Sequence, residues 1–289
     1  MYSSIHSKQI MNKLKPGLYC VSTPIGNMDD FSFRGQATLR NSHLILCEDT
    51  RVSKKLLTKY NIKNKVVSYH KFNEKKKLSE IVDELNNQKI ISIISDAGTP
   101  SISDPGALLF KECIKNDINI YPIPGPSAVT SAISVSSFSD KFIFCGFLPD
   151  KKGEIEKIFK EILNLNYSIV FFISPKKIKK IIPILQIYFE GRDILICREI
   201  SKVYEEYIRT SIKNLANIEY SEKGEATLVI SNPKIINRHL KELNESDKRI
   251  INKLIRTMSV KDIVNKFNKK NQIPKKIIYK YCIEKKNEI

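Results

Sequence analysis

The sequence predicts an α/β fold of two α/β domains followed by a small helical unit. Short runs rich in Ile and Val alternate with amphipathic stretches through the first 230 residues. This alternation is typical of strands buried in a parallel or mixed sheet and of the helices that connect them. A turn of two prolines and one glycine divides the runs into two sets. The 289 residues are enough for two domains of ordinary size and a short appendage.

The first set of runs predicts an N-terminal α/β domain over residues 16–124. Its strands are expected at 18–23, 43–48, 65–70 and 89–95 and in the run that ends at Ile123, and its helices at 51–60, 74–87 and 105–115. Because strands and helices alternate, we expect strands joined by right-handed crossovers.

The boundary between the domains is expected at residues 123–126, Ile-Pro-Gly-Pro, which can neither continue a strand nor begin a regular helix. The second domain, residues 125–231, has predicted strands at 141–147, 168–174, 193–199 and 226–231 and helices near 151–164 and 175–190. In the appendage, residues 232–289, apolar residues repeat at helical spacing from Ile250 to Ile263 and from Ile277 to Ile283. The appendage is therefore predicted to be a small helical unit.

The chain is strongly basic, with 49 Lys and Arg residues, 31 Asp and Glu residues and a formal net charge of +18. Residues 234–289 are especially basic, with about 16 basic and about 6 acidic residues. Such an excess favours polyanionic partners, nucleic acid above all, through long-range attraction and counterion release. The alternative is a biased genome composition that places Lys on solvated faces throughout, since the chain is also rich in Ile and Asn and has no Trp.

Several classes of protein are not expected. The six cysteines show no C-x-x-C spacing, which argues against a metal site and suits a reducing compartment. No apolar run approaches the length of about 18 residues that a membrane span needs, and the first fifteen residues lack the apolar segment of a signal peptide. The motifs of P-loop enzymes, zinc hydrolases, α/β-hydrolases and EF-hands are also missing. We expect a cytoplasmic protein that binds neither metal nor membrane.

The first two loops that follow predicted strands stand where open α/β sheets bind ligands. In the segment TPIGN, residues 23–27, Pro24 lacks a backbone donor and Gly26 permits close approach of a ligand; a tight turn with nothing bound is the alternative. In CEDTR, residues 47–51, neighbouring strand residues point to opposite faces. We therefore expect one of Glu48 and Asp49 to bind substrate and the other to pair with Arg51, with Thr50 as a helix cap. The alternative is a self-neutralising capping cluster.

The third loop is SDAGTPSISDPG, Ser95 to Gly106. Asp96 directly follows an apolar strand, in a constrained turn, and is expected to meet a cationic or hydroxylated ligand. Asp104 and Pro105 are expected to begin the next helix as its N-cap and its first residue. Replacing Asp96 with Ala should therefore weaken ligand binding far more than replacing Asp104, whose loss should mainly lower stability.

Two further loops add candidates. PGPSA, residues 124–128, begins a helix of small residues, which either admits a planar ligand or packs closely on the sheet. His70 follows the strand at 65–70, beside a possible helix start. It is a surface or packing residue unless the other loops meet it at the same edge of the sheet.

Seven segments together carry a resemblance, in the order TPIGNMDD, CEDTR, SYHKFNE, SDAGTPSISDPG, PGPSAVTSAIS, GFLP and KGEATLVI. The chain resembles the tetrapyrrole-methylase superfamily over roughly residues 16–231, and within it the members that methylate ribosomal RNA. The tail resembles the small C-terminal helical unit of those members. The resemblance implies a class III methyltransferase, with S-adenosylmethionine in the cleft between two α/β domains, and a homodimer. It also implies the product, a cytidine in the decoding region of 16S rRNA, in the small ribosomal subunit, methylated on its ribose 2′-oxygen.

Cofactor contacts are carried over by position from the matching segments. They are Pro24, Ile25, Gly26, Asn27, Asp96, Ala97, Gly98, Thr99, Ser101, Ser127, Ala128 and Phe172. The chain departs from the family pattern at two places. Ile173, Lys176 and Lys177 stand in a stretch that is commonly Glu-Ser-Pro-His-Arg-like, and Val52 stands where a histidine is common. These departures weigh against a catalytic role for the four positions, or against full activity.

Methyl transfer from a sulfonium to a ribose hydroxyl is a direct displacement, which an enzyme accelerates mainly by aligning oxygen, carbon and sulfur in a dry cleft. A base that takes the hydroxyl proton adds roughly 10²–10⁴-fold. Glu48, Asp49, His70 and Glu74 are the candidates, and the first two are favoured because burial at a strand end can raise the pKa of a carboxyl. Phosphate contacts are then expected from Arg51 and Lys54.

Two other functions stay open on the sequence. One is an enzyme of the same fold that methylates a small tetrapyrrole, against which the basic tail argues. The other is a non-catalytic RNA-binding or ribosome-assembly factor, which is not expected to bind S-adenosylmethionine.

Overall fold

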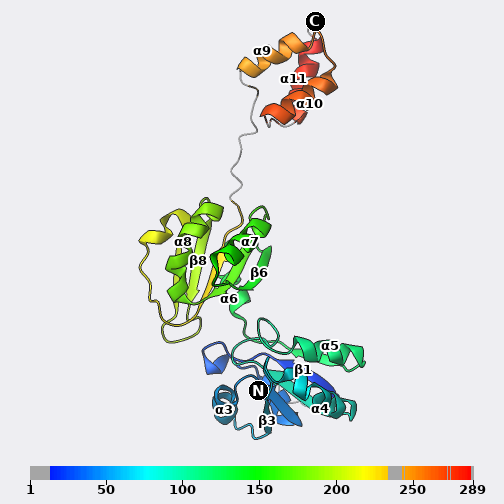
Figure 1. Ribbon diagram of the computed structural model, residues 1–289, viewed down its shortest axis with the longest axis vertical. Coiled ribbons are helices and arrows are strands. Elements are labelled where there is room, and N and C mark those ends of the chain that lie inside the picture. Colours follow the sequence, from blue (N-terminus) through cyan, green and yellow to red (C-terminus); the bar gives the residue numbers. More distant parts are fainter. Residues whose placement is uncertain (1–13, 234–242, 244, 272, 274, 288–289) are drawn as a thin grey trace, which may run out of the picture. The chain divides into compact units, whose positions relative to one another are not determined.

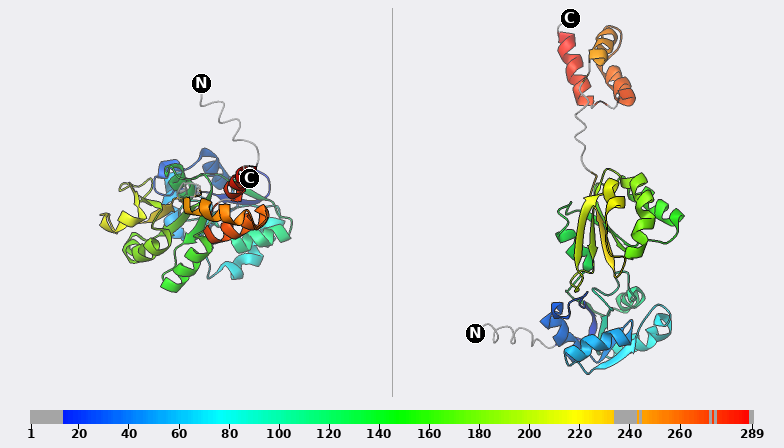
Figure 2. Two further views of the ribbon diagram at one scale, coloured as in Figure 1. Left: turned by 90° about the horizontal axis from the view of Figure 1, so that it is seen from above. Right: turned by 90° about the vertical axis from the view of Figure 1, so that its left-hand side faces the viewer.

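The computed structural model describes residues 14–233, 243, 245–271, 273 and 275–287. The chain divides into two compact units between residues 232 and 233. The described part of the first unit contains two five-stranded sheets with helices on both faces, and the described part of the second contains three helices (Figures 1 and 2). The predicted α/β class with a C-terminal helical unit is confirmed.

The first sheet is parallel throughout, with the strand order β3-β2-β4-β1-β5. Its strands are β1 (Gly17–Val21), β2 (Leu44–Cys47), β3 (Lys65–Ser68), β4 (Ile90–Ile94) and β5 (Ile120–Ile123). All five predicted strands are present. The central strands β1, β2 and β4 are apolar and almost wholly buried because helices cover both faces of the sheet.

Four helices cover the first sheet. One face packs against α2 (Phe33–Asn41) and α3 (Thr50–Lys59), and the other against α4 (Glu74–Asn86) and α5 (Ala107–Lys115). The short helix η1 (Met28–Asp30) and α2 were not predicted, since α2 buries Gly35, Thr38 and Leu39 and so lacks a clear apolar stripe. The predicted cap Thr50 is wrong: Asp49 is the N-cap of α3, and its carboxylate accepts a 2.8 Å hydrogen bond from Arg51 N.

The second sheet is mixed, with the strand order β6-β7-β10-β8-β9 and one parallel pair, β6 and β7. Its strands are β6 (Phe142–Phe147), β7 (Ser168–Ile173), β8 (Asp193–Arg198), β9 (Glu206–Ser211) and β10 (Ala226–Ile230). The predicted helices α7 (Lys152–Ile162) and α8 (Pro175–Phe189) cover one face, and α6 (Ala128–Ser134) covers the other. β9 was not predicted, because it is a half-exposed edge strand of largely polar sequence, followed by η2 (Ile212–Asn217). We retain 16–124, 125–231 and 232–289 as proposed domain limits.

The second unit consists, in its described part, of α9 (Glu245–Leu254), α10 (Val260–Asn271) and α11 (Lys275–Asn287). These helices bury a core of their own that includes Ile251, Ile263 and Ile278. The predicted repeat from Ile250 to Ile263 is two helices, because the chain turns after Leu254 and Ser259 caps α10 through a 3.2 Å hydrogen bond from Asp262 N. Residues 234–242 of the predicted appendage lie outside the described residues. None of the described helices is both long and apolar enough to span a lipid bilayer.

Candidate cofactor cavity and active site

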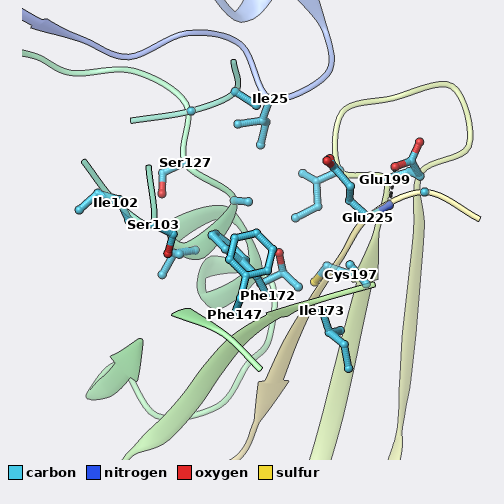
Figure 3. Close-up of a pocket in the computed structure, with 18 of the residues that line it drawn as sticks. Ile25, Ile102, Ser103, Ser127, Phe147, Phe172, Ile173, Cys197, Glu199 and Glu225 are labelled. Carbon is cyan, nitrogen blue, oxygen red and sulfur yellow. Dashed lines mark hydrogen bonds between the residues drawn. The ribbon is translucent and has the colours of Figure 1, made fainter. Parts of the chain in front are cut away.

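A cavity of about 330 Å³ lies in the first unit, where loops of the first sheet face strand ends of the second (Figure 3). It is lined by Ile25, residues 96–99 and 102–104, residues 127–129, Phe147, residues 172–174, Cys197, Glu199, Ile200, Lys202 and residues 224–227. The loops after β1 and β4 meet there because these two parallel strands are neighbours. Thr23 and Gly98 join the loops through backbone hydrogen bonds of 2.8 and 3.1 Å. The volume falls within the range of roughly 300–1,000 Å³ that is usual for small-ligand sites.

The structure brings together most of the residues expected to contact a cofactor. Eight of the twelve line the cavity, namely Ile25, Asp96, Ala97, Gly98, Thr99, Ser127, Ala128 and Phe172. The other four, Pro24, Gly26, Asn27 and Ser101, are not in its lining. The three segments expected from the first half of the chain therefore converge on one cavity, as the rule for strand carboxyl ends predicts.

Gly26 lies in close contact with the loop between β8 and β9, not at the cavity surface. A Cβ atom at this position would lie 2.5 Å from Lys202 Cγ and 2.8 Å from the carbonyl oxygen of Ile200. Next to it, Asn27 N donates a 3.1 Å hydrogen bond to Ser201 Oγ. The loop after β1 thus closes against the loop between β8 and β9, and the missing side chain of Gly26 makes this close approach possible.

The second sheet supplies a group of charged residues that was not predicted from the sequence. Lys202 Nζ lies 2.9 Å from Glu199 Oε1 and 2.8 Å from Glu225 Oε2, and Glu225 N donates to Glu199 Oε1 at 2.9 Å. Burial acts to raise the pKa of Glu199, but the hydrogen bonds from Lys202 and Glu225 N outweigh it and leave this pKa below its usual value. Glu199 and Glu225 follow β8 and precede β10, so their positions at strand ends of the second sheet are the sequence signal that could have found them.

An aromatic group forms part of the apolar wall. The Phe172 ring makes edge contacts with Phe144 and Phe147, with centroid distances of 4.8 and 5.3 Å. Phe147 is 64% exposed although it lines the cavity, and Figure 3 shows its ring beside that of Phe172. Such a wall suits the planar or apolar part of a ligand.

Replacement of Phe172 by Ala is expected to weaken S-adenosylmethionine binding by roughly tenfold, since removing a partly buried aromatic side chain costs on the order of 1–2 kcal/mol. Calorimetric titration of the purified variant measures this. Phe142→Ala is the matched control, because Phe142 is exposed on the same sheet and is not in the cavity lining. Equal affinities of the two variants would contradict a role of the Phe172 ring in binding.

The predicted role of Asp104 as a helix cap is wrong. Helix α5 begins at Ala107, its N-cap is Gly106 with a φ of +131°, and no side chain caps it. The loop turns through left-handed conformations at Ser101 and Ser103, with φ of +67° and +70°. These turns place Asp104 in the cavity wall together with Asp96.

Both carboxyls in this loop have raised pKa values. Burial raises the pKa of Asp104 to about 6, and the negative charges of Glu48 and Asp96 act in the same direction. Burial also raises the pKa of Asp96, although Asp49 N donates a 3.2 Å hydrogen bond to Asp96 Oδ1 and offsets part of the effect. Carboxyls whose pKa values are displaced toward neutrality are common at catalytic sites.

The residues expected to act as a base lie outside the cavity lining. Asp49 makes the predicted pair with Arg51, at 2.6 Å, and this contact lowers the pKa of Asp49 to about 2. Glu48 is half-buried and close enough to Asp104 to raise the pKa of that residue. His70 is tied to its own loop, with Nε2 3.2 Å from Asn73 Nδ2.

The remaining predicted positions are spread over the first unit. Arg51 and Lys54 are exposed on α3, and Glu74 is the first residue of α4. Of the positions that depart from the family pattern, Val52 is 39% exposed, and Lys177 pairs with Asp150. Ile173 is buried and adds to the apolar part of the cavity lining, and Lys176 is exposed.

Two solved structures share this fold. Diphthine synthase matches with a TM-score of 0.59 and 12% identity, over 74% of this chain and 89% of that one. A cobalt precorrin-4 methyltransferase of cobalamin biosynthesis matches with a TM-score of 0.53 and 18% identity, over 74% of this chain and 94% of that one. At these identities the likeness concerns the fold.

Sequence comparison gives a narrower assignment. The family described as tetrapyrrole (corrin/porphyrin) methylases matches residues 17–216. Three relatives are named ribosomal RNA small subunit methyltransferase I. The one from Mesomycoplasma conjunctivae is 46% identical over 73% of this chain and 89% of its own length. The one from Thermotoga maritima is 42% identical over 74% of this chain and 97% of its own length. The one from Buchnera aphidicola is 36% identical over 96% of this chain and 100% of its own length. The chain therefore belongs to the tetrapyrrole methylase family, in the group of relatives named ribosomal RNA small subunit methyltransferase I.

Proposed function

We propose that this chain transfers a methyl group from S-adenosylmethionine to 16S rRNA in the small ribosomal subunit, at the ribose 2′-oxygen of a cytidine in the decoding region. The observation that carries the proposal is the 46% identity to a small-subunit rRNA methyltransferase over 89% of that relative's length. The nucleotide and the atom come from the motif resemblance and are part of the proposal.

The residues around the cavity fit this cofactor. S-adenosylmethionine supplies an electrophilic methyl group on a positively charged sulfonium, and it also carries an ammonium group, ribose hydroxyls and a planar adenine. Asp96 and Asp104 offer acceptors for the cationic and hydroxyl groups, while Phe147, Phe172 and Val129 provide apolar contacts. We therefore assign the cavity to the cofactor, with Ser127 and Ala128 at the start of α6 beside it.

The protein's own contribution is to hold the two reactants in line and to exclude water. The loop after β1 and the loop between β8 and β9 close one side of the cavity through Gly26, Asn27 and Ser201. We assign RNA phosphate contacts to Arg51 and Lys54, which are exposed on α3. Glu48, Asp49 and His70 lie outside the cavity lining. We assign to Asp49 the holding of the Asp96 carboxylate through its backbone amide, and we keep Glu48 and His70 as candidate bases on the substrate side.

The helical unit is assigned to RNA affinity. The Thermotoga relative aligns over 97% of its own length, but with only 74% of this chain. Too few of its residues remain to form a counterpart of the helical unit. The Buchnera relative, in contrast, aligns with 96% of this chain. Both carry the same name. The chemistry is therefore assigned to the first unit, and the basic helices are an addition that strengthens binding to the ribosomal subunit. A homodimer located in the cytoplasm completes the proposal.

The test is to incubate purified protein and labelled S-adenosylmethionine with small subunits that lack the modification, and to identify the methylated nucleoside by mass spectrometry. We expect a 2′-O-methylcytidine in the decoding region, and no incorporation into subunits that already carry it. A methylated base would contradict the assigned atom. If calorimetry shows no binding of S-adenosylmethionine, the remaining interpretation is a non-catalytic ribosome-assembly factor. Light scattering measures the mass of the protein in solution and so tests the proposed dimer.

A further inference from the structure

The loop after β3 holds an aromatic side chain out in solvent. Phe72 is 98% exposed and belongs to neither core of the first sheet. Its ring makes a T-shaped contact with the imidazole of His70, at a centroid distance of 6.0 Å. At this exposure the faces of the Phe72 ring are open to a planar ligand.

Hydrogen bonds fix the loop that carries Phe72. Asn73 Oδ1 accepts a 2.8 Å hydrogen bond from His70 N, and Asn73 N donates a 2.9 Å hydrogen bond to the His70 carbonyl oxygen. The Ser68 carbonyl oxygen at the end of β3 accepts from Asn73 Nδ2 at 3.1 Å and from Lys77 Nζ at 3.0 Å. The exposed ring therefore stands on an ordered loop, so little conformational freedom is lost when a ligand covers it.

The loop after β3 lies at the edge of the first sheet that faces the cavity. Strand β3 runs parallel to β2, and Tyr69 N donates a 2.7 Å hydrogen bond to the Cys47 carbonyl oxygen at the end of β2. Two residues after Cys47, Asp49 N donates to the Asp96 carboxylate in the cavity wall. Phe72 itself is not in the cavity lining. A ligand on its ring would thus lie beside the cavity and not within it.

The surroundings of Phe72 are basic. Residues 71–77 hold four lysines and one glutamate, and Lys71, Lys75 and Lys76 are exposed. Burial raises the pKa of Asp104 in the cavity wall to about 6, and Lys71 is close enough to oppose part of this shift. Proteins bind unpaired nucleotides with this combination, since lysines attract the phosphates and an aromatic ring stacks on the base. A second copy of this chain fits less well, because its net charge of +18 would be repelled.

We propose that Phe72 stacks on an unpaired nucleobase of the rRNA, next to the nucleotide whose ribose is methylated, an inference that rests on the proposed function. The exposed lysines of residues 71–77 bind the phosphates of the same strand, together with Arg51 and Lys54 on α3. The stacked base and these phosphates hold the RNA strand at the edge of the sheet, which places the target ribose at the cavity.

The first test measures kinetics of the full-length protein on small subunits. Phe72→Ala is expected to raise the KM for small subunits about 5- to 100-fold and to leave kcat within a few fold, because it removes the stacked ring. Phe72→Leu keeps an apolar side chain without an aromatic face and should resemble Phe72→Ala, whereas Phe72→Trp should restore the wild-type KM. The affinity for S-adenosylmethionine should stay unchanged in all three variants, since Phe72 is not in the cavity lining.

Ile114→Ala is the matched control for these kinetics. Ile114 is also exposed, at 69%, but it lies at the end of α5 that leads into β5, and so at the opposite edge of the first sheet. Its replacement should leave the KM for small subunits as in the wild type.

The second test detects stacking by fluorescence. The chain has no Trp, so Phe72→Trp and Ile114→Trp each contain one. Stacking on a nucleobase quenches indole emission. Free 16S rRNA should therefore quench the Trp at position 72 strongly and the Trp at position 114 weakly.

The outcomes separate this inference from the proposed function. Wild-type protein that makes no 2′-O-methylcytidine contradicts the proposed function. If the wild type is active, an unchanged KM in Phe72→Ala, or a Phe72→Leu variant with the KM of Phe72→Trp, overturns the stacking role alone. Equal quenching of the two Trp residues overturns it as well. A lower mass of Phe72→Ala than of wild type in light scattering would show that a second copy of the chain covers Phe72 in place of RNA.

Discussion

Removal of residues 234–289 is expected to weaken binding to small-subunit rRNA strongly at moderate salt. The slope of log affinity against log salt should become shallower by about one for each phosphate that the shortened chain no longer binds. The segment holds about 16 basic and about 6 acidic residues. Affinity for S-adenosylmethionine should stay within about twofold, because the second unit has its own core and none of its described residues lines the cavity. Binding titrations at three or more salt concentrations, with calorimetry for the cofactor, measure both quantities.

A full-length variant separates the effect of charge from that of the structural unit. Lys275, Lys276 and Lys280 are exposed on α11, so their replacement by Gln removes three charges and keeps the helical core. It should reproduce part of the truncation effect. Replacement of Lys157 and Lys160, exposed on α7, by Gln is the control for charge in general. RNA affinity that is the same for truncated and full-length protein at every salt concentration would falsify the assignment of the helical unit.

Gly26→Ala is expected to lower cofactor affinity by about 10–100-fold, although Gly26 is not in the cavity lining. The new methyl group has no room between the loop after β1 and the loop between β8 and β9, where Lys202 Cγ and the Ile200 carbonyl lie 2.5 and 2.8 Å from its position. Overpacking of this kind costs about 1–3 kcal/mol, and the loops must separate to relieve it. Because Ile25, Ile200 and Lys202 line the cavity, their displacement changes its shape. Calorimetry measures the affinity, and thermal unfolding measures the stability.

Gly153→Ala is the matched control for this substitution. Gly153 lies in the first turn of α7, and a Cβ atom there would meet nothing within 4 Å. Ala should leave cofactor affinity unchanged and raise stability by about 0.4–1 kcal/mol, because it is the better helix former. Wild-type cofactor affinity in Gly26→Ala would show that the two loops do not need to meet for binding.

The sequence predicted nine of the ten described strands, because each of them is a short apolar run that ends at a turn signal. It missed β9 and α2, whose residues are polar or small and which pack at the edge or through small side chains. It also predicted eight residues of the cavity lining, which the resemblance to the family implied. Seven of them follow strands of the parallel sheet or begin α6, where ligands of α/β sheets bind. Phe172 lies within β7 of the mixed sheet and was implied by the resemblance alone.

The sequence by itself determined the apolar strands, the basic helical appendage, and a ligand site at one edge of the first sheet. The segments around Ile25, Asp96 and Ser127 form that site. Only the tertiary structure decided what the residues of that edge do. Asp104 looks like a helix cap in the sequence, but the left-handed turns at Ser101 and Ser103 carry it into the cavity wall. Gly26 looks like a ligand residue, but it serves the packing of two loops that are far apart in the sequence. The reason is physical: local sequence sets which residues end a strand, whereas the burial, pKa and neighbours of a side chain depend on what the rest of the chain packs against it.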